Sequence, residues 1–205
     1  MKNGILVGIA SMAMVVVTSN VLVQFLLGDW LTWGAITYPV AFFVTDITNR
    51  LYGVYAARKV VFFGFIVGII CSLVGTKISG EFGPLVSFRV AIGSGSAFLV
   101  AQLIDVSIFD KLRSRKWWIA PFSSSMIGSS VDTFLFFSIS FSTFFIFLDF
   151  NDNVDWANEI VPLVGVGPNL PLWISLGLAD FLVKVLLAMC ILVPFKLVTV
   201  KNLIT

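Results

Sequence analysis

The chain has 205 residues, of which 59% are hydrophobic and only 12% charged, and its formal net charge at pH 7 is +2. A water-soluble domain carries about 25% charged residues because its surface must be solvated, so this composition predicts that lipid surrounds most of the chain. The small net charge argues against a nucleic-acid partner. Histidine, the commonest general base and metal ligand, is absent, and we expect no cofactor.

Long apolar runs recur along the chain, and a membrane helix needs about 20 such residues. We therefore expect an all-α membrane protein, a compact bundle of six transmembrane helices in a single domain, residues 1–205. The first run is too long for the apolar core of a signal peptide, so we expect it to be retained as a helix. The predicted helices cover residues 4–27, 35–55, 60–79, 87–109, 118–147 and 172–195, with an outer loop at 148–171.

Two prolines predict irregularities in this series. Pro39 lies near the start of the second predicted helix, where it frees a backbone carbonyl and favours a kink. Pro121 lies near the start of the fifth and marks either its first turn or a kink.

The basic residues predict the orientation, because Lys and Arg concentrate in cytoplasmic loops. Aromatic belts agree, with Trp30, Trp33 and Tyr38 at the predicted outer interface. Both termini are then cytoplasmic, and the localisation we expect is the bacterial inner membrane. The predicted cytoplasmic side carries Lys2, Arg58, Lys59, Lys111, Arg113, Arg115, Lys116, Lys196 and Lys201, whereas the outer loops carry Lys77 with Asp29, Glu81, Asp149, Asp152, Asp155 and Glu159.

Seven charges remain inside the predicted helices. Each costs about 2.5–3.5 kcal/mol at the centre of a bilayer, so we expect them to face the bundle interior and to be paired. They are Asp46, Arg50, Arg89, Asp105, Asp132, Asp180 and Lys184.

Spacing suggests partners for several of these charges. Asp180 and Lys184 are four residues apart and share a helix face, as do Asp46 and Arg50. Arg50 and Asp105 lie at similar depths near the cytoplasmic ends of their helices, which predicts a structural ion pair between them. Asp132 has no opposite charge on its own helix, so it is protonated, paired with Lys184, or reserved for a ligand.

Amide side chains occur at related depths, and amides both donate and accept hydrogen bonds. Together with the charges they predict a polar cavity between the helices. The small residues nearby are more typical of close helix packing. The candidate substrate-binding residues are Asp132, Asp180, Lys184, Asn20, Gln24, Gln102 and Asp46.

Several stretches occur in a characteristic order from the first helix to the sixth. They are Thr18-Ser19-Asn20 with Gln24; Thr32-Trp33-Gly34-Ala35 with Thr45-Asp46-Ile47 and Arg50; Arg89-Val90-Ala91; Gln102-Leu103-Ile104-Asp105-Val106; Trp117-Trp118-Ile119-Ala120-Pro121; Gly128 with Asp132-Thr133; and Asp180 with Lys184. In this order and spacing the chain resembles the queuosine precursor transporter family, also called the vitamin uptake transporter family. Each of the seven membrane charges falls inside a matching stretch.

The resemblance implies a carrier for a 7-deazaguanine precursor of queuosine, the 7-cyano or 7-aminomethyl base, without an ATPase module. The guanine-like edge of such a base offers two adjacent N–H donors, which one carboxylate can accept with both oxygens. Asp132 is the first candidate for this role and Asp180 the second. Phe43 or Phe137 are candidates for stacking on the flat ring.

Alternatives from other classes stay open. The first is a substrate-binding membrane subunit that needs a separate ATPase module for uptake of a vitamin-like small molecule. An intramembrane enzyme would need a nucleophile–base pair or metal ligands, and Cys71 and Cys190 are isolated in apolar runs. A scaffold without a ligand does not account for seven membrane charges. The expected partners are a small-molecule substrate and the bilayer, with a homo-oligomer left open.

Overall fold

The computed structural model describes residues 2–80, 83–150 and 152–201, and within them the chain is mostly helical. Glu81, one of the predicted outer acids, lies outside these ranges. Four helices among these residues are long and apolar enough to cross a membrane, which supports a multi-pass membrane protein. They are α1 (Lys2–Leu22), α4 (Val54–Gly75), α5 (Phe88–Leu112) and α8 (Leu172–Lys201).

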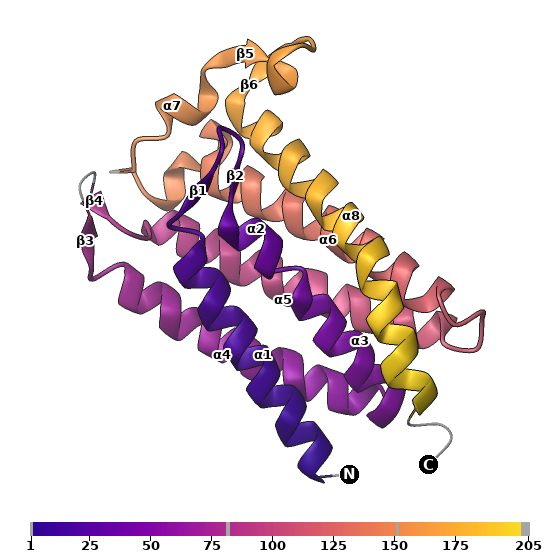
Figure 1. The fold of residues 1–205 in the computed structure, drawn as a ribbon. Coiled ribbons are helices and arrows are strands. Elements are labelled where there is room, and N and C mark those ends of the chain that lie inside the picture. Colours follow the sequence, from indigo (N-terminus) through magenta and orange to yellow (C-terminus); the bar gives the residue numbers. More distant parts are fainter. Residues whose placement is uncertain (1, 81–82, 151, 202–205) are drawn as a thin grey trace.

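The long helices lie side by side as a bundle together with α6 (Ile119–Phe141), which has 23 residues and is rich in serine (Figure 1). Between α1 and α4 the chain returns along the bundle in two short helices, α2 (Trp33–Thr37) and α3 (Val40–Tyr52). The start of α1 and the end of α8 lie together at what we call the terminal end (Figure 1).

Three short antiparallel hairpins lie at the opposite end, which we call the hairpin end (Figure 1). The third hairpin, with α7 (Asp155–Asn158) and the short 3-10 helix η2 (Leu163–Gly165), gives structure to the predicted outer loop. The strand pairs are β1 (Leu26–Leu27) with β2 (Leu31–Thr32), β3 (Ser79–Gly80) with β4 (Gly83–Pro84), and β5 (Ile160–Pro162) with β6 (Asn169–Pro171).

The prediction of one continuous helix over residues 35–55 is wrong. Helix α2 ends at Thr37 and α3 begins at Val40, with Tyr38 and Pro39 between them. Proline has no backbone N–H to donate to the preceding turn, so the helix breaks here, as the kink predicted at Pro39 anticipates. The turn into α4 needs a single residue, Gly53, whose φ of +85° is accessible to glycine at little cost.

The predicted ends of other helices also need correction. Helix α1 stops at Leu22 rather than residue 27, because the chain enters the first hairpin. Helix α4 covers 54–75 rather than 60–79, since it begins directly after Gly53. Helix α6 stops at Phe141 rather than residue 147, and the 3-10 helix η1 (Thr143–Leu148) follows an extended Ser142.

Buried Arg89 fixes the position at which α6 ends. Its Nε donates to the carbonyl of Ile139 at 2.7 Å, and its Nη2 donates to the carbonyl of Ser142. These carbonyls belong to the last turn of the helix, where a cation is favoured and acceptors lack partners within the helix. One of the seven membrane charges is therefore a cap for α6.

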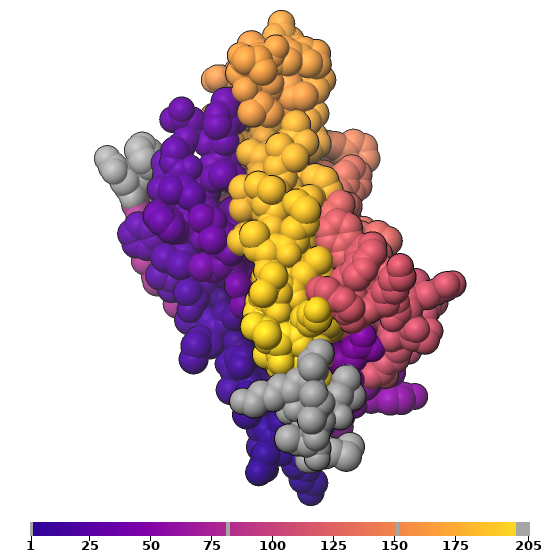
Figure 2. Space-filling model, turned by 45° about the vertical axis from the view of Figure 1, so that its right-hand side comes forward, coloured from indigo at the N-terminus to yellow at the C-terminus, as the bar shows by residue number. Residues whose placement is uncertain are grey.

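The apolar core lies between α1, α3, α4 and α5, around residues such as Met12, Ala41, Val60 and Phe98. Helix α8 runs along one face of the molecule, between the N-terminal segments and α6 (Figure 2). Helices α5 and α6 approach closely at Gly128, where a Cβ atom would lie 2.8 Å from Cε1 of Phe42 and 3.2 Å from Cβ of Asp105.

This close approach predicts that Gly128→Ala destabilises the protein by about 1–3 kcal/mol, because an added methyl group overpacks the interface. Gly68→Ala is the matched control, since its Cβ would lie an ordinary 3.6 Å from Cγ1 of Val16. Alanine is the better helix former, so the control should be neutral or stabilising. Thermal unfolding of both variants in detergent measures the difference, and equal transition temperatures would contradict the packing.

Candidate functional site

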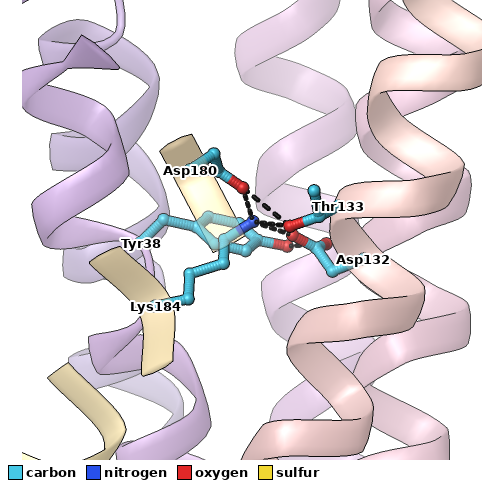
Figure 3. Close-up of polar contacts among 5 residues, drawn as sticks. All are labelled: Tyr38, Asp132, Thr133, Asp180 and Lys184. Carbon is cyan, nitrogen blue, oxygen red and sulfur yellow. Dashed lines mark hydrogen bonds and ion pairs between the residues drawn. The ribbon is translucent and has the colours of Figure 1, made fainter. Parts of the chain in front are cut away.

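Two acidic side chains converge on one lysine between α6 and α8 (Figure 3). Lys184 Nζ lies 2.7 Å from Oδ2 of Asp132 and 2.5 Å from Oδ2 of Asp180. The exposed fractions of these side chains are 4% for Lys184, 5% for Asp132 and 12% for Asp180. Because the three charges are withdrawn from solvent, their attraction is only weakly screened.

Neighbouring hydroxyl groups complete this arrangement. Thr133 Oγ1 donates to Oδ2 of Asp180 at 2.7 Å, and Lys184 Nζ also lies 3.1 Å from Thr133 Oγ1. Tyr38 donates its phenolic O–H to Oδ1 of Asp132 at 2.9 Å. We call these five residues the Lys184 cluster; all are drawn in Figure 3.

Tyr38 is the member of the cluster that the sequence misplaced. We predicted it at the outer interface, but it is half-buried in the bundle, and its ring centroid lies 5.4 Å from Nζ of Lys184. It occupies the break between α2 and α3, so Pro39 is the reason that its side chain reaches the site. A tyrosine directly before a helix-breaking proline, within a predicted membrane span, was the available signal.

The Lys184 cluster contains more acidic than basic groups, with two carboxylates and one ammonium group. Both oxygens of Asp132 accept hydrogen bonds, from Tyr38 and from Lys184. Oδ2 of Asp180 accepts from Thr133 and Lys184, whereas Oδ1 has no donor among the described residues. The cluster therefore holds acceptor capacity that a ligand with N–H groups can use.

The cluster borders a cavity of about 530 Å³ that reaches the hairpin end of the bundle. This volume lies in the range of pockets that enclose small organic molecules. One wall is aromatic and comes from α6 and α7, with successive ring centroids 5.1–5.8 Å apart. Its members are Phe136, Phe137, Phe141 and Trp156.

Five of the seven predicted substrate-binding residues line this cavity: Asn20, Gln24, Asp132, Asp180 and Lys184. The amide of Asn20 donates to the carbonyl of Val16 at 2.9 Å, which leaves its oxygen for other donors. Of the predicted stacking residues, Phe137 lines the cavity. Phe43 instead packs near the terminal end, against the cluster of Phe109, Ala120 and Phe195.

Asp46 and Gln102 do not belong to the cavity lining. Asp46 accepts hydrogen bonds from Ser124 and Ser125 at 3.3 and 3.4 Å, and Gln102 accepts one from Thr45 at 2.9 Å. Both are buried between α3, α5 and α6. The structure thus divides the predicted polar residues between two places.

The ion pair expected between Arg50 and Asp105 is not formed. Arg50 Nη1 donates to the carbonyl of Arg113 at 2.7 Å, and neither carboxylate oxygen of Asp105 has a hydrogen-bond partner within the described part of the chain. Arg113 follows the last residue of α5, and the carbonyls at a helix C-terminus attract cations. A similar depth in the membrane was therefore not enough to predict a contact.

A bundle of apolar helices around a small, charged cavity is typical of membrane proteins that bind polar small molecules. The chain belongs to the family described as "Putative vitamin uptake transporter", which matches residues 32–199. This is a family of transporters rather than enzymes. No solved structure matches the chain.

Curated relatives agree with this assignment. The chain is 35% identical over 174 residues to the "Probable queuosine precursor transporter" of Haemophilus influenzae, a match that covers 80% of this chain and 66%, just under two thirds, of the relative. It is 32% identical over 195 residues to the "Queuosine precursor transporter" of Escherichia coli, covering 88% of this chain and 79% of the relative.

The Lys184 cluster predicts a specific pattern of stability. Lys184→Met leaves two buried carboxylates without their cation and should cost about 3–5 kcal/mol. Adding Asp132→Asn and Asp180→Asn removes the stranded charges and should recover much of the loss. Unfolding of the single and triple variants in detergent tests this. A Lys184→Met protein as stable as the wild type would show that the three charges do not interact as described.

Proposed function

We propose that the protein imports a 7-deazaguanine precursor of queuosine, 7-cyano-7-deazaguanine or a related base, through the cavity above the Lys184 cluster. The observation that carries this proposal is the pair of carboxylates at the cavity wall, in a chain whose curated relatives are named queuosine precursor transporters. A planar base with several N–H groups matches both the acidic wall and the aromatic wall.

Asp132 is the proposed acceptor for the guanine-like edge. Its two oxygens accept hydrogen bonds from Tyr38 and Lys184, so the two N–H groups of the base take the place of these donors. Lys184 remains neutralised by Asp180, which is one helical turn away on α8. A freed N–H of Lys184 can then donate to the carbonyl oxygen of the base.

The rest of the cavity would hold the remainder of the base. Phe137, whose ring lies 5.8 Å from that of Phe141, supplies a flat apolar surface for the ring system. Asn20 and Gln24 enter from the end of α1 and supply amide groups for the ring nitrogens or the substituent at position 7. Aromatic contact would supply affinity, and the polar groups would select the base.

Asp132→Asn tests this assignment. It keeps the size of the side chain but adds an N–H₂ group that opposes the donors of the base, so binding of 7-cyano-7-deazaguanine should be lost. Lys184 keeps Asp180 as its counter-ion, so thermal stability should stay close to wild type. Asp110→Asn, the same change at a half-exposed position near the terminal end, is the matched control.

Calorimetry on purified protein measures the affinities of both variants. If Asp132→Asn retains its affinity, Asp132 does not form the site and Asp180 becomes the acceptor. Uptake of the base by liposomes that contain this chain alone tests transport directly. Uptake only after addition of an ATPase module would identify a binding subunit instead.

We also propose that the chain crosses the bacterial inner membrane six times, with both termini in the cytoplasm. The six crossings are α1, the broken pair α2–α3, α4, α5, α6 and α8. Helix α6 is not among the four most clearly apolar long helices, and its polar residues Ser124, Ser129 and Asp132 are buried inside the bundle. The positive charge near the terminal end supports this orientation.

Labelling tests this topology. In a background without Cys71 and Cys190, a cysteine introduced at Asn153 should react with a membrane-impermeant reagent added outside the cell. A reporter enzyme that works only in the cytoplasm should be active when it is fused to the C terminus, and one that works only outside the cytoplasm should be inactive there. Labelling of position 153 only from the cytoplasmic side would reverse the orientation.

A further inference from the structure

A second group of polar side chains is buried between α3 and α5, on the side of the Lys184 cluster toward the terminal end. We call Asp46, Asn49, Gln102 and Asp105 the inner carboxyl cluster. The exposed fraction of each is 2% or less. Asp46 and Asp105 interact electrostatically with each other, and neither forms a salt bridge with a described residue.

Several polar atoms of this cluster have no hydrogen-bond partner among the described residues. They are both carboxyl oxygens of Asp105, Oδ1 of Asn49 and Nε2 of Gln102. The amide of Asn49 donates to the carbonyl of Val106, next to Asp105, which places the free Asn49 oxygen beside α5. Buried polar atoms are rarely left unpaired, and three of these four are acceptors. Unpaired acceptors therefore outnumber unpaired donors in this cluster.

The neighbouring charged residues do not donate hydrogen bonds to these unpaired acceptors. Arg50 follows Asp46 by one turn of α3 but donates to the carbonyl of Arg113. Arg113 in turn donates to the carbonyls of Asn49 and Arg50. Helix α6 faces the cluster with Ser124, Ser125 and Gly128, which are uncharged, and Lys184 on α8 belongs to the other cluster.

Two buried carboxylates side by side repel each other strongly in a low dielectric, and a bound cation removes the repulsion. The site has little room for a metal ion with its coordination shell, because even a methyl group at Gly128 would press on Asp105 and Phe42. A proton needs no such room.

We propose that Asp105 binds a proton and that this proton is the coupling ion of transport. On binding, one O–H bond forms on a carboxyl oxygen of Asp105, and the charge of the pair changes from −2 to −1. On release the same bond breaks and the proton leaves to the other side of the membrane. Asp46 is the ionised partner, because the hydroxyl groups of Ser124 and Ser125 already stabilise its charge.

Both clusters are hydrogen-bonded to the segment of Tyr38 and α3 on one side and to α6 on the other, so the two can influence each other. Tyr38 precedes α3 by two residues and holds Asp132, while Asp46 lies on α3 itself. On α6, Asp132 follows Ser124 by eight residues, or about 12 Å along the axis. A shift of α3 against α6 therefore changes the hydrogen bonds of Asp46 and those of Asp132 together.

Infrared spectroscopy on the purified protein without substrate tests the proton site. The wild type should show the carbonyl band of a protonated carboxylic acid that exchanges slowly with heavy water. Asp105→Asn, which resembles the protonated state in shape and charge, should lack this band, whereas Asp110→Asn on the same helix should keep it. A wild type without such a band at any pH where it is folded overturns the proposal, as does a band that persists in Asp105→Asn.

Transport measurements test the coupling, which rests on the proposed function. Liposomes with a pH gradient, acidic outside, should accumulate 7-cyano-7-deazaguanine above the external concentration with wild type. Asp105→Asn should bind the base and exchange it across the membrane without accumulation. Accumulation driven by a sodium gradient and indifferent to pH overturns the coupling. If the wild type binds none of this base, the proposed function fails, and the infrared band still decides whether Asp105 holds a proton.

Discussion

The ion triad of Lys184 with Asp132 and Asp180 is the interaction on which the rest of the site depends. A charged side chain inside a membrane helix is expensive, and in this bundle one cation shared by two carboxylates offsets that cost. The triad joins α6 to α8 and fixes the floor of the cavity at the depth where Tyr38 enters. An excess of one negative charge remains, and we propose that this excess favours a molecule that presents N–H donors.

The sequence predicted the parts of this site that follow from spacing along one helix. Asp180 and Lys184 are four residues apart, so a helix necessarily places them on one face, and the structure confirms their pairing. Contacts between helices depend on rotation about each helix axis, which spacing does not specify. For this reason Arg50 was paired with Asp105 when it in fact contacts the end of α5, and Gln102 was placed in the cavity when it contacts Thr45.

Pro39 illustrates a second limit. The sequence indicated a kink at this position. The direction in which a broken helix turns depends on its neighbours, so the sequence alone could not predict that Tyr38 lies in the site. The structure of the residues outside the long helices was harder to predict from the sequence. The predicted outer loop contains a hairpin and α7, and Trp156 of α7 forms part of the aromatic wall. Small residues such as Gly128 were correctly interpreted as packing positions, and the helices approach closely there.

The central claim is that Asp132 and Asp180 in the cavity wall accept hydrogen bonds from the N–H donor edge of a deazaguanine. The most direct measurement compares, by calorimetry on the purified protein, the affinity for 7-cyano-7-deazaguanine with that for the same base without its exocyclic amino group. A hydrogen bond to a charged group is worth about 1.5–3 kcal/mol, so the account predicts that the truncated base binds roughly 10- to 150-fold more weakly. Equal affinities for the two bases would contradict it.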